Sequence, residues 1–171
     1  MIYPFNGKEP EIADSAFIAD SADIIGDVTI GEESSIWFNT TLRGDTGAIS
    51  IGNGSNIQDG STIHQNANMP VIIEDEVTIG HGCIIHGATI RKGALIGIGA
   101  IVLDGAEVGE GAIVGAGSIV TAGKKISPGM LAIGTPAKEL REVKEEEKAN
   151  VSAGVKTYKA ETKMYKRLQG K

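Results

Sequence analysis

Residues 89–120 read TIRKGALIGIGAIVLDGAEVGEGAIVGAGSIV and decide the fold, because an aliphatic residue recurs in them at every sixth position. The same spacing extends from Ile12 to Ile126, and 15 of its 18 intervals are six residues long. The exceptions are intervals of nine, ten and five residues, from Leu42 to Ile51, Ile63 to Ile73 and Ile85 to Ile90. A period of six fits neither an α-helix, with about 3.6 residues per turn, nor a simple β alternation.

The physical account of this period is a parallel β-helix. Each hexapeptide forms one short flat side with its aliphatic residue pointing inward, and three sides close a coil. Stacked coils pair their backbones at a spacing of about 4.8 Å and bury a column of aliphatic side chains. The pattern therefore predicts an all-β solenoid of about seven coils over residues 12–134, after an N-terminal extension over residues 1–11. A β-sandwich is disfavoured, because its strands need no fixed period of six.

Composition supports a turn-rich β protein and excludes several functions. The 24 glycines indicate frequent tight turns, and aromatics make up only 4% of the chain, so the core must be aliphatic. The net charge of -6, with no basic stripe in the first 137 residues, argues against nucleic acid as a partner. We expect no membrane span and no signal peptide, because no apolar run is long enough, and we expect a cytoplasmic location.

The C-terminal part, residues 135–171, differs in composition from the repeat. Thr135 can cap a helix that has Pro136 at its first position, and residues 137–149 are rich in Lys, Glu and Arg. An apolar stripe at helical spacing then follows at Val151, Val155, Tyr158, Thr162, Tyr165 and Leu168. We therefore expect a C-terminal α-helix, with a break near Asn150, that packs its stripe on the outside of the β-helix.

All three histidines of the chain fall between residues 64 and 86. His64 follows the inward Ile63 and His86 follows the inward Ile85, and these two isoleucines are three sides, or one coil, apart. The two histidines should therefore stack in the same position of adjacent coils, about 4.8 Å apart. This is close enough for both imidazoles to bind one metal ion. The alternative is a chance cluster of surface histidines.

His81 occupies a different position, on the side before His86. An extended segment from 81 to 86 spans up to about 16 Å, whereas zinc needs each nitrogen at about 2.0 to 2.1 Å. The simplest way to complete a three-histidine site is for His81 to come from a neighbouring chain. The three flat sides suit a homotrimer with metal sites at its interfaces. Cys83 occupies the small inward position of the repeat, and we expect it to be buried and inert.

Several runs of residues resemble the gamma-class carbonic anhydrases and their relatives in the hexapeptide-repeat superfamily. They are Trp37–Asp45, Asn56–Gly60, His64, Val77–Cys83 and Ile85–Gly87. The resemblance covers nearly the whole chain and implies a left-handed β-helix. It also implies that His64, His81 and His86 bind zinc, or alternatively iron or cobalt, with His81 donated by the adjacent subunit of a trimer.

The resemblance implies roles for six further residues. Gln58 would bind the hydroxide on the metal, and Asn56 would orient the substrate region. Tyr158 would either overhang the site or simply pack the helix on the coils. Arg43, Asp45 and Asp59 would make charged contacts across the trimer interface. The implied reaction is hydration of carbon dioxide, a small-molecule substrate, to bicarbonate.

The chain departs from the family pattern at the proton shuttles. Well-characterised gamma-class enzymes have a glutamate directly after the Arg-x-Asp aspartate and an acidic loop after the first histidine. Here Thr46 takes the first place, and residues 64–70, HQNANMP, contain no acid. Since each turnover must export a proton, we expect slow turnover with unchanged metal binding.

Two other functions stay open at this stage. The same β-helix hosts acyltransferases and thioesterases that act on acyl-coenzyme A, which need one histidine as a general base. Relatives also include non-catalytic assembly or binding proteins, because a fold does not fix an activity. Three histidines at metal spacing favour the metalloprotein over both.

Overall fold

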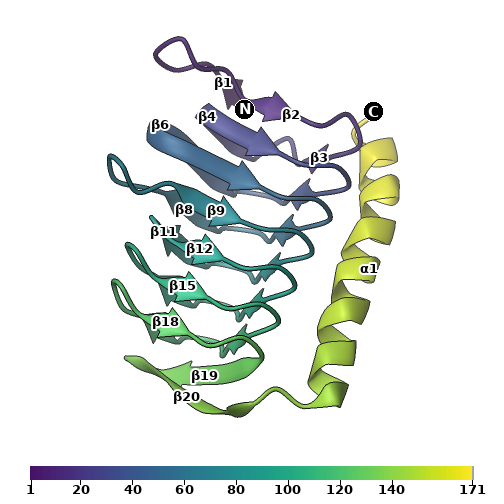
Figure 1. The fold of residues 1–171 in the computed structure, drawn as a ribbon. Helices are drawn as coiled ribbons and strands as arrows, with labels where there is room; N and C mark the ends of the chain where they lie inside the picture. The colour runs from purple at the N-terminus through teal and green to yellow at the C-terminus, as the bar shows by residue number, and fades with distance from the viewer. Residues whose placement is uncertain (171) are drawn as a thin grey trace.

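The computed structural model describes residues 1–170 and forms a parallel β-helix with one α-helix along its outside (Figure 1). The coils stack from the N-terminal strands to a hairpin of β19 (Met130–Gly134) and β20 (Ala137–Glu142), and the helix runs back beside them. This arrangement confirms the all-β solenoid of about seven coils with a C-terminal helix. Lys171, the last residue of the expected C-terminal segment, lies outside the described part.

The strands form three faces. The face that carries the histidines contains β1 (Ile2–Tyr3), β8 (Thr62–His64), β11 (Ile84–His86), β14 (Ile101–Val102) and β17 (Ile119–Val120). The second face contains β2 (Glu11–Ile12), β9 (Val71–Ile73), β12 (Thr89–Ile90), β15 (Glu107–Val108) and β18 (Lys125–Ile126). Two long strands, β4 (Asp23–Ile30) and β6 (Thr41–Ile51), pass around the corner and contribute to both faces.

The third face lies beneath the helix. It contains β3 (Phe17–Ile18), β5 (Ser35–Ile36), β7 (Asn56–Ile57), β10 (Thr78–Ile79), β13 (Leu95–Ile96), β16 (Ile113–Val114) and β19 (Met130–Gly134), and β20 (Ala137–Glu142) pairs antiparallel with β19. Within the face, β3 through β19 pair in parallel, one strand per coil. Each coil therefore satisfies the backbone groups of the next.

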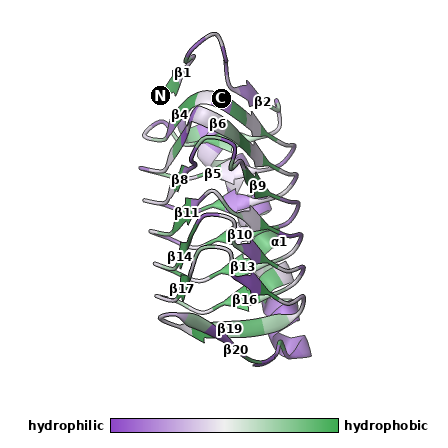
Figure 2. Cartoon of the chain, turned by 60° about the vertical axis from the view of Figure 1, so that its left-hand side comes forward, coloured by the Kyte–Doolittle hydropathy of each residue, from purple (hydrophilic) through white to green (hydrophobic). Residues whose placement is uncertain are grey.

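The core is the predicted aliphatic column. Ile63, Ile85 and Val102 are fully buried and stack in register on the histidine face, and the other faces repeat this arrangement. Figure 2 shows hydrophobic strands alternating with more polar turns along the stack. The small inward residues are buried as expected, Cys83 among them, and burial raises the pKa of the Cys83 thiol. A protonated, enclosed thiol is chemically inert.

The C-terminal segment corrects two expectations. Thr135 does not cap a helix, because residues 137–142 form β20 and extend the last coil as a hairpin. The helix α1 spans Glu145–Leu168 and continues through Asn150 without a break. Lys144 is its N-cap, and the Glu147 carboxylate accepts a hydrogen bond from the Lys144 backbone N–H. Ladder pairing with β19 thus decides the structure of a segment whose local signals indicate a helix.

Aromatic packing attaches the C-terminal half of α1 to the early coils. The Trp37 ring lies 5.2 Å from Phe17, 5.2 Å from Tyr158 and 4.9 Å from Tyr165 between ring centroids. Val155 and Thr162 on the predicted stripe are buried, whereas Leu168 is 79% exposed. The packed stripe therefore ends at Tyr165.

Candidate metal centre

The register of the β-helix brings His64 and His86 together. Strands β8 and β11 pair in parallel, with His64 directly opposite His86. The ring centroids lie 5.1 Å apart, and Nδ1 of His64 is 3.1 Å from Nε2 of His86. This geometry confirms that the two histidines share one position in adjacent coils.

Each histidine of this pair also binds a carboxylate. Asp45 Oδ1 lies 3.0 Å from Nε2 of His64, and Asp104 Oδ1 lies 2.5 Å from Nδ1 of His86. A carboxylate only accepts hydrogen bonds, so the ring nitrogen that faces it carries the proton. When both histidines are neutral, the two nitrogens that face each other are therefore unprotonated, and each presents a lone pair.

Two lone pairs at 3.1 Å repel unless a cation lies between them. Two nitrogen ligands at about 2.05 Å from a tetrahedral metal ion are separated by about 3.3 Å, which is close to the observed separation. The outer carboxylates complete the carboxylate–histidine–metal arrangement that fixes ligating imidazoles in metalloproteins. The residues present therefore fit a divalent metal ion.

Asp45 is held as an anion. Burial raises the pKa of its carboxyl, but hydrogen bonds from His64 and Arg43 outweigh this effect and leave the pKa below its ordinary value. Arg43 also forms an ion pair with Asp45 within the chain. The structure thus places Arg43 and Asp45 next to the histidine pair. Together, Arg43, Asp45, His64, His86 and Asp104 are called the paired half-site below.

His81 lies at another corner. It follows β10 by two residues, as Asp59 follows β7, and because Ile57 and Ile79 are in register these two side chains stack. Asp59 Oδ2 lies 3.0 Å from Nδ1 of His81. Nε2 of His81 is the ring nitrogen that Asp59 does not contact, and the His81 side chain is nearly half exposed. Within residues 1–170, no three His, Cys, Asp or Glu side chains converge on one metal position.

The predicted Asn56, Gln58 and Tyr158 lie near His81 rather than near the pair. Asn56 Nδ2 donates to Thr78 Oγ1 at 2.9 Å, and Gln58 Nε2 donates to Asn56 Oδ1 at 3.0 Å. Burial, followed by the negative charge of Asp59, raises the pKa of Tyr158. We call Asn56, Gln58, Asp59, His81 and Tyr158 the single half-site.

A groove of about 350 Å³ opens at this half-site between α1 and the third face. Its lining includes Gln58 and Tyr158, together with the outward Leu95 and Ile113 of the coils. Gly154 of α1 adds no side chain there and so keeps the groove open. The groove is mostly apolar, and Gln58 is one of its few polar lining residues.

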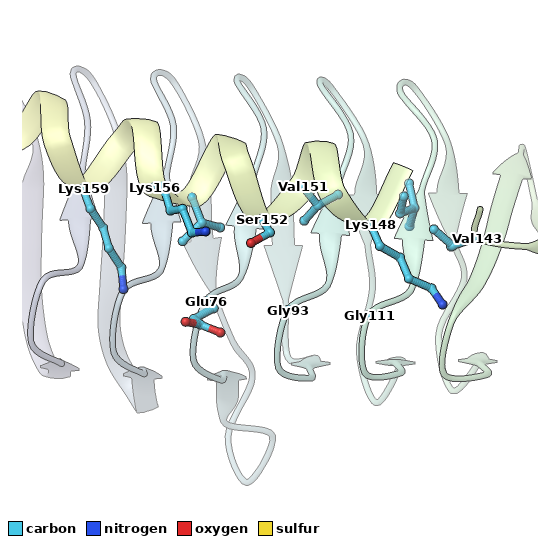
Figure 3. Close-up of a pocket in the computed structure, with 11 residues that line it drawn as sticks. Glu76, Gly93, Gly111, Val143, Lys148, Val151, Ser152, Lys156 and Lys159 are labelled. Atoms are coloured by element: carbon cyan, nitrogen blue, oxygen red, sulfur yellow. The ribbon is translucent and has the colours of Figure 1, made fainter. Parts of the chain in front are cut away.

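A second groove, of about 310 Å³, lies on the other flank of α1 (Figure 3). Lys148, Lys156 and Lys159 extend from the helix, and Glu76 lies on a coil beneath it. Lys148 pairs with Glu145 at 2.6 Å and Lys159 lies 3.5 Å from Glu33, so much of the positive charge is neutralised. None of the three histidines lines this groove.

Sequence reasoning missed Asp104. It follows the inward Val102 by two residues, and Val102 is paired with Ile85. Asp104 therefore lies one coil beyond His86 and one position farther along the turn. The sequence places Asp104 and His86 at nearly the same position of adjacent coils. That their side chains meet is shown only by the structure.

This chain is similar to known proteins in sequence and in fold. The family "Bacterial transferase hexapeptide (six repeats)" matches residues 87–122. A carbonic anhydrase of Geobacillus kaustophilus is 56% identical over 169 residues, which cover 99% of this chain and 93% of the relative. The mitochondrial gamma carbonic anhydrase 1 of Arabidopsis thaliana is 43% identical over 88% of this chain and 57% of its own length. This chain belongs to the gamma carbonic anhydrase family of hexapeptide-repeat proteins.

This chain is also similar to proteins named for transfer reactions. A crystal structure from Bacillus cereus, whose name proposes an acetyltransferase, has 53% identity and a TM-score of 0.96 over 98% of this chain and 97% of its own. The family therefore implies a metal, while the names of its members leave the reaction open. The described residues, 1–170, include no α-helix that could span a membrane.

Proposed function

We propose that this chain is a metal-dependent carbonic anhydrase of the gamma class that works as a homotrimer. The paired half-site is the observation that carries the proposal. Two in-register imidazoles have facing nitrogens 3.1 Å apart, and each ring is backed by a carboxylate. Zinc is the proposed ion, with iron or cobalt as alternatives, because all suit imidazole ligands.

The third ligand in this proposal is His81 of a neighbouring copy. His81 is exposed at a corner, and its Nδ1 is already held by Asp59. The face that carries the histidine pair also presents outward aliphatic residues in register, Ile84, Ile101 and Ile119. Ile84 is 41% exposed in the single chain. An apolar column beside an incomplete ligand set suits a second copy of this chain as its cover.

His64, His86 and the His81 of a neighbouring copy would hold a divalent metal, which would lower the pKa of its water to about 7 and would supply hydroxide for the hydration of carbon dioxide. The residues of the chain position this chemistry. Gln58 donates its Nε2 to Asn56, so its Oε1 is the end that can accept a hydrogen bond from the attacking group. The groove beside Gln58 is mostly apolar.

Proton export limits the proposed reaction. Thr46 uses its hydroxyl to donate to the Gln65 carbonyl at 2.8 Å, and the loop over residues 65–70 has no acid to accept a proton. The rate of carbon dioxide hydration should therefore rise with the concentration of an imidazole buffer, which replaces the missing proton acceptor.

The test of this proposal is the metal content per chain and its dependence on His81. Protein purified without chelators or affinity tags and reconstituted with zinc, or anaerobically with iron, should hold close to one metal per chain. His81→Ala should lose the metal while staying folded. Lys92→Ala, which changes another exposed residue two positions after an inward isoleucine, should keep it.

Mixed trimers test the intersubunit arrangement. The His81→Ala chain retains an intact paired half-site, and a His64→Ala, His86→Ala chain retains an intact His81. Mixing the two should restore some metal sites. If mixed trimers form and no metal returns, the shared site is wrong.

A second candidate is an acyltransferase or thioesterase acting on acyl-coenzyme A. His81, oriented by Asp59, would be its general base, beside the apolar groove that opens at Gln58. Failure to retain metal under all reconstitution conditions would favour this function over carbon dioxide hydration.

A further inference from the structure

The Asp104 side chain contacts both a proposed metal ligand, His86, and the loop that follows His64. It lies on the turn after β14, one coil beyond His86, and its Oδ1 is 2.5 Å from Nδ1 of His86. Its other oxygen, Oδ2, accepts a hydrogen bond from Nδ2 of Asn66 at 2.9 Å. One carboxylate is therefore held from two sides, by the ring that it orients and by a residue of the loop after His64.

The backbone leaves space for this contact at Gly87. A Cβ atom at Gly87 would lie 2.5 Å from Asp104 Oδ1 and 3.3 Å from Cβ of Met69. Gly87 also has a φ of +55°, which disfavours other residues. The position directly after His86 is thus bare, and Asp104 fills the space from the next coil.

The loop that carries Asn66 is anchored at its start by Gln65. The Gln65 side chain is buried, and its Nε2 donates to the Gly47 carbonyl at 2.7 Å. Thr46 donates its hydroxyl to the Gln65 backbone carbonyl. Asn66 is therefore presented to Asp104 from an anchored segment, at a separation of 38 residues in sequence.

We infer that Asp104 is a positioning residue for His86, that it selects the tautomer with the proton on Nδ1, and that Asn66 holds Asp104 in the required orientation. The inference rests on the proposed metal site. Without the carboxylate, His86 can place its proton on Nε2, the nitrogen that faces His64, and this tautomer cannot bind a metal there. Asp104 itself acts through His86 and contacts neither metal nor substrate.

The inference is tested by measuring the zinc affinity of the purified and reconstituted protein, by competition with a chelator. Asp104→Ala should weaken binding about 10- to 100-fold, the usual effect of removing such a partner. Asp104→Asn keeps an acceptor oxygen without the charge and should lose less. Asn66→Ala should weaken binding less than Asp104→Ala. The control, Asp27→Asn, removes an exposed carboxylate that pairs with Lys8 and should bind like the wild type.

The visible spectrum of the cobalt-substituted protein separates positioning from general stability. A reoriented His86 should change the intensity of the cobalt bands in Asp104→Ala and leave them unchanged in Asp27→Asn. Should Asp104→Ala fail to fold, Asp104→Asn has nearly the same shape and carries the comparison. Wild-type affinity and an unaltered cobalt spectrum in the variants would overturn the inference.

A measurement without metal separates this inference from the proposed function. Nitrogen-15 spectra of the metal-free protein report which nitrogen of His86 carries the proton. We expect Nδ1–H in the wild type and in Asp27→Asn, and a mixture of tautomers in Asp104→Ala. The same mixture in the wild type would refute the positioning role. If the protein binds no metal but His86 shows the Nδ1–H tautomer only when Asp104 is present, the proposed function fails and the positioning role stands.

Discussion

His64 and His86 occupy the same position in adjacent coils, and the nitrogens that face each other, Nδ1 and Nε2, lie 3.1 Å apart. Because Asp45 and Asp104 hold the outer nitrogens, the inner lone pairs converge. A cation between them removes their repulsion, so metal binding and folding stability should be coupled.

Metal removal should therefore destabilise the protein. Zinc present at 100 times its dissociation constant stabilises the folded state by about 2.7 kcal/mol. A chelator should lower the melting temperature of the wild type and leave that of His86→Ala unchanged, as followed by circular dichroism. Lys92→Ala is the control and should respond like the wild type. Equal chelator sensitivity in wild type and His86→Ala would contradict the paired half-site.

The inward column should carry much of the stability. Ile96 is fully buried, whereas Ile98, two residues later, is 59% exposed. Ile96→Ala should lower the free energy of unfolding by about 2–5 kcal/mol. Ile98→Ala, which deletes the same atoms from an exposed side chain, should change it by no more than about 0.5 kcal/mol. Urea unfolding of the two variants measures both, and similar losses would show that the register is wrong.

Two glycines of one turn should differ in their tolerance of alanine. A Cβ at Gly97 would lie 2.5 Å from the backbone nitrogen of Ala116 on the next coil. At Gly99 nothing lies within 4 Å, and the only penalty is the φ of +67°, about 1–2 kcal/mol. Gly97→Ala should therefore destabilise the protein more than Gly99→Ala, because it forces two coils apart. Thermal unfolding of both variants decides this, and the reverse order would refute the close approach.

Glu147 should stabilise the start of α1 to an extent that depends on pH. Hydrogen bonds from Arg141 and the Lys144 backbone lower the pKa of Glu147 to about 2. Because the pKa of Glu147 in the folded protein is below its ordinary value of 4.5, its stabilisation of the fold is present above pH 4.5. This stabilisation is lost as the pH falls toward 2. Glu147→Gln should melt below the wild type at pH 7, and the difference should shrink across this interval.

Glu146→Gln is the matched control for this helix start. Glu146 is an exposed neighbour in the same first turn. Its substitution should leave the pH dependence of melting close to that of the wild type. A difference between Glu147→Gln and wild type that stays constant from pH 7 to pH 2 would exclude the ion pair as its cause.

Much of the site followed from counting along the sequence. Because the period is fixed at six, counting from the inward residues assigns every residue a position in its coil. The stacking of His64 on His86 could therefore be predicted from the number of sides between them. The same counting predicted that His81 lies at a different corner. It could not show that Asp104 reaches His86, because this contact depends on the bare position at Gly87 and on the rotamers of both side chains.

The segment after residue 134 shows where local signals fail. A proline following a threonine, with charged residues beyond, indicates a helix start, yet residues 137–142 pair with β19 instead. An unpaired last strand would expose its backbone donors and acceptors, and a returning strand satisfies them. This gain depends on the end of the stack, which no local window contains.

The sequence by itself determined the coil, its number of repeats and the shared position of two histidines, because backbone pairing at a constant spacing propagates one local period through the whole chain. Only the tertiary structure decided which carboxylate backs each histidine, how the last coil is closed and where α1 begins. These features depend on side chains and chain ends that meet across coils, where space and hydrogen-bond partners, rather than periodicity, select the arrangement.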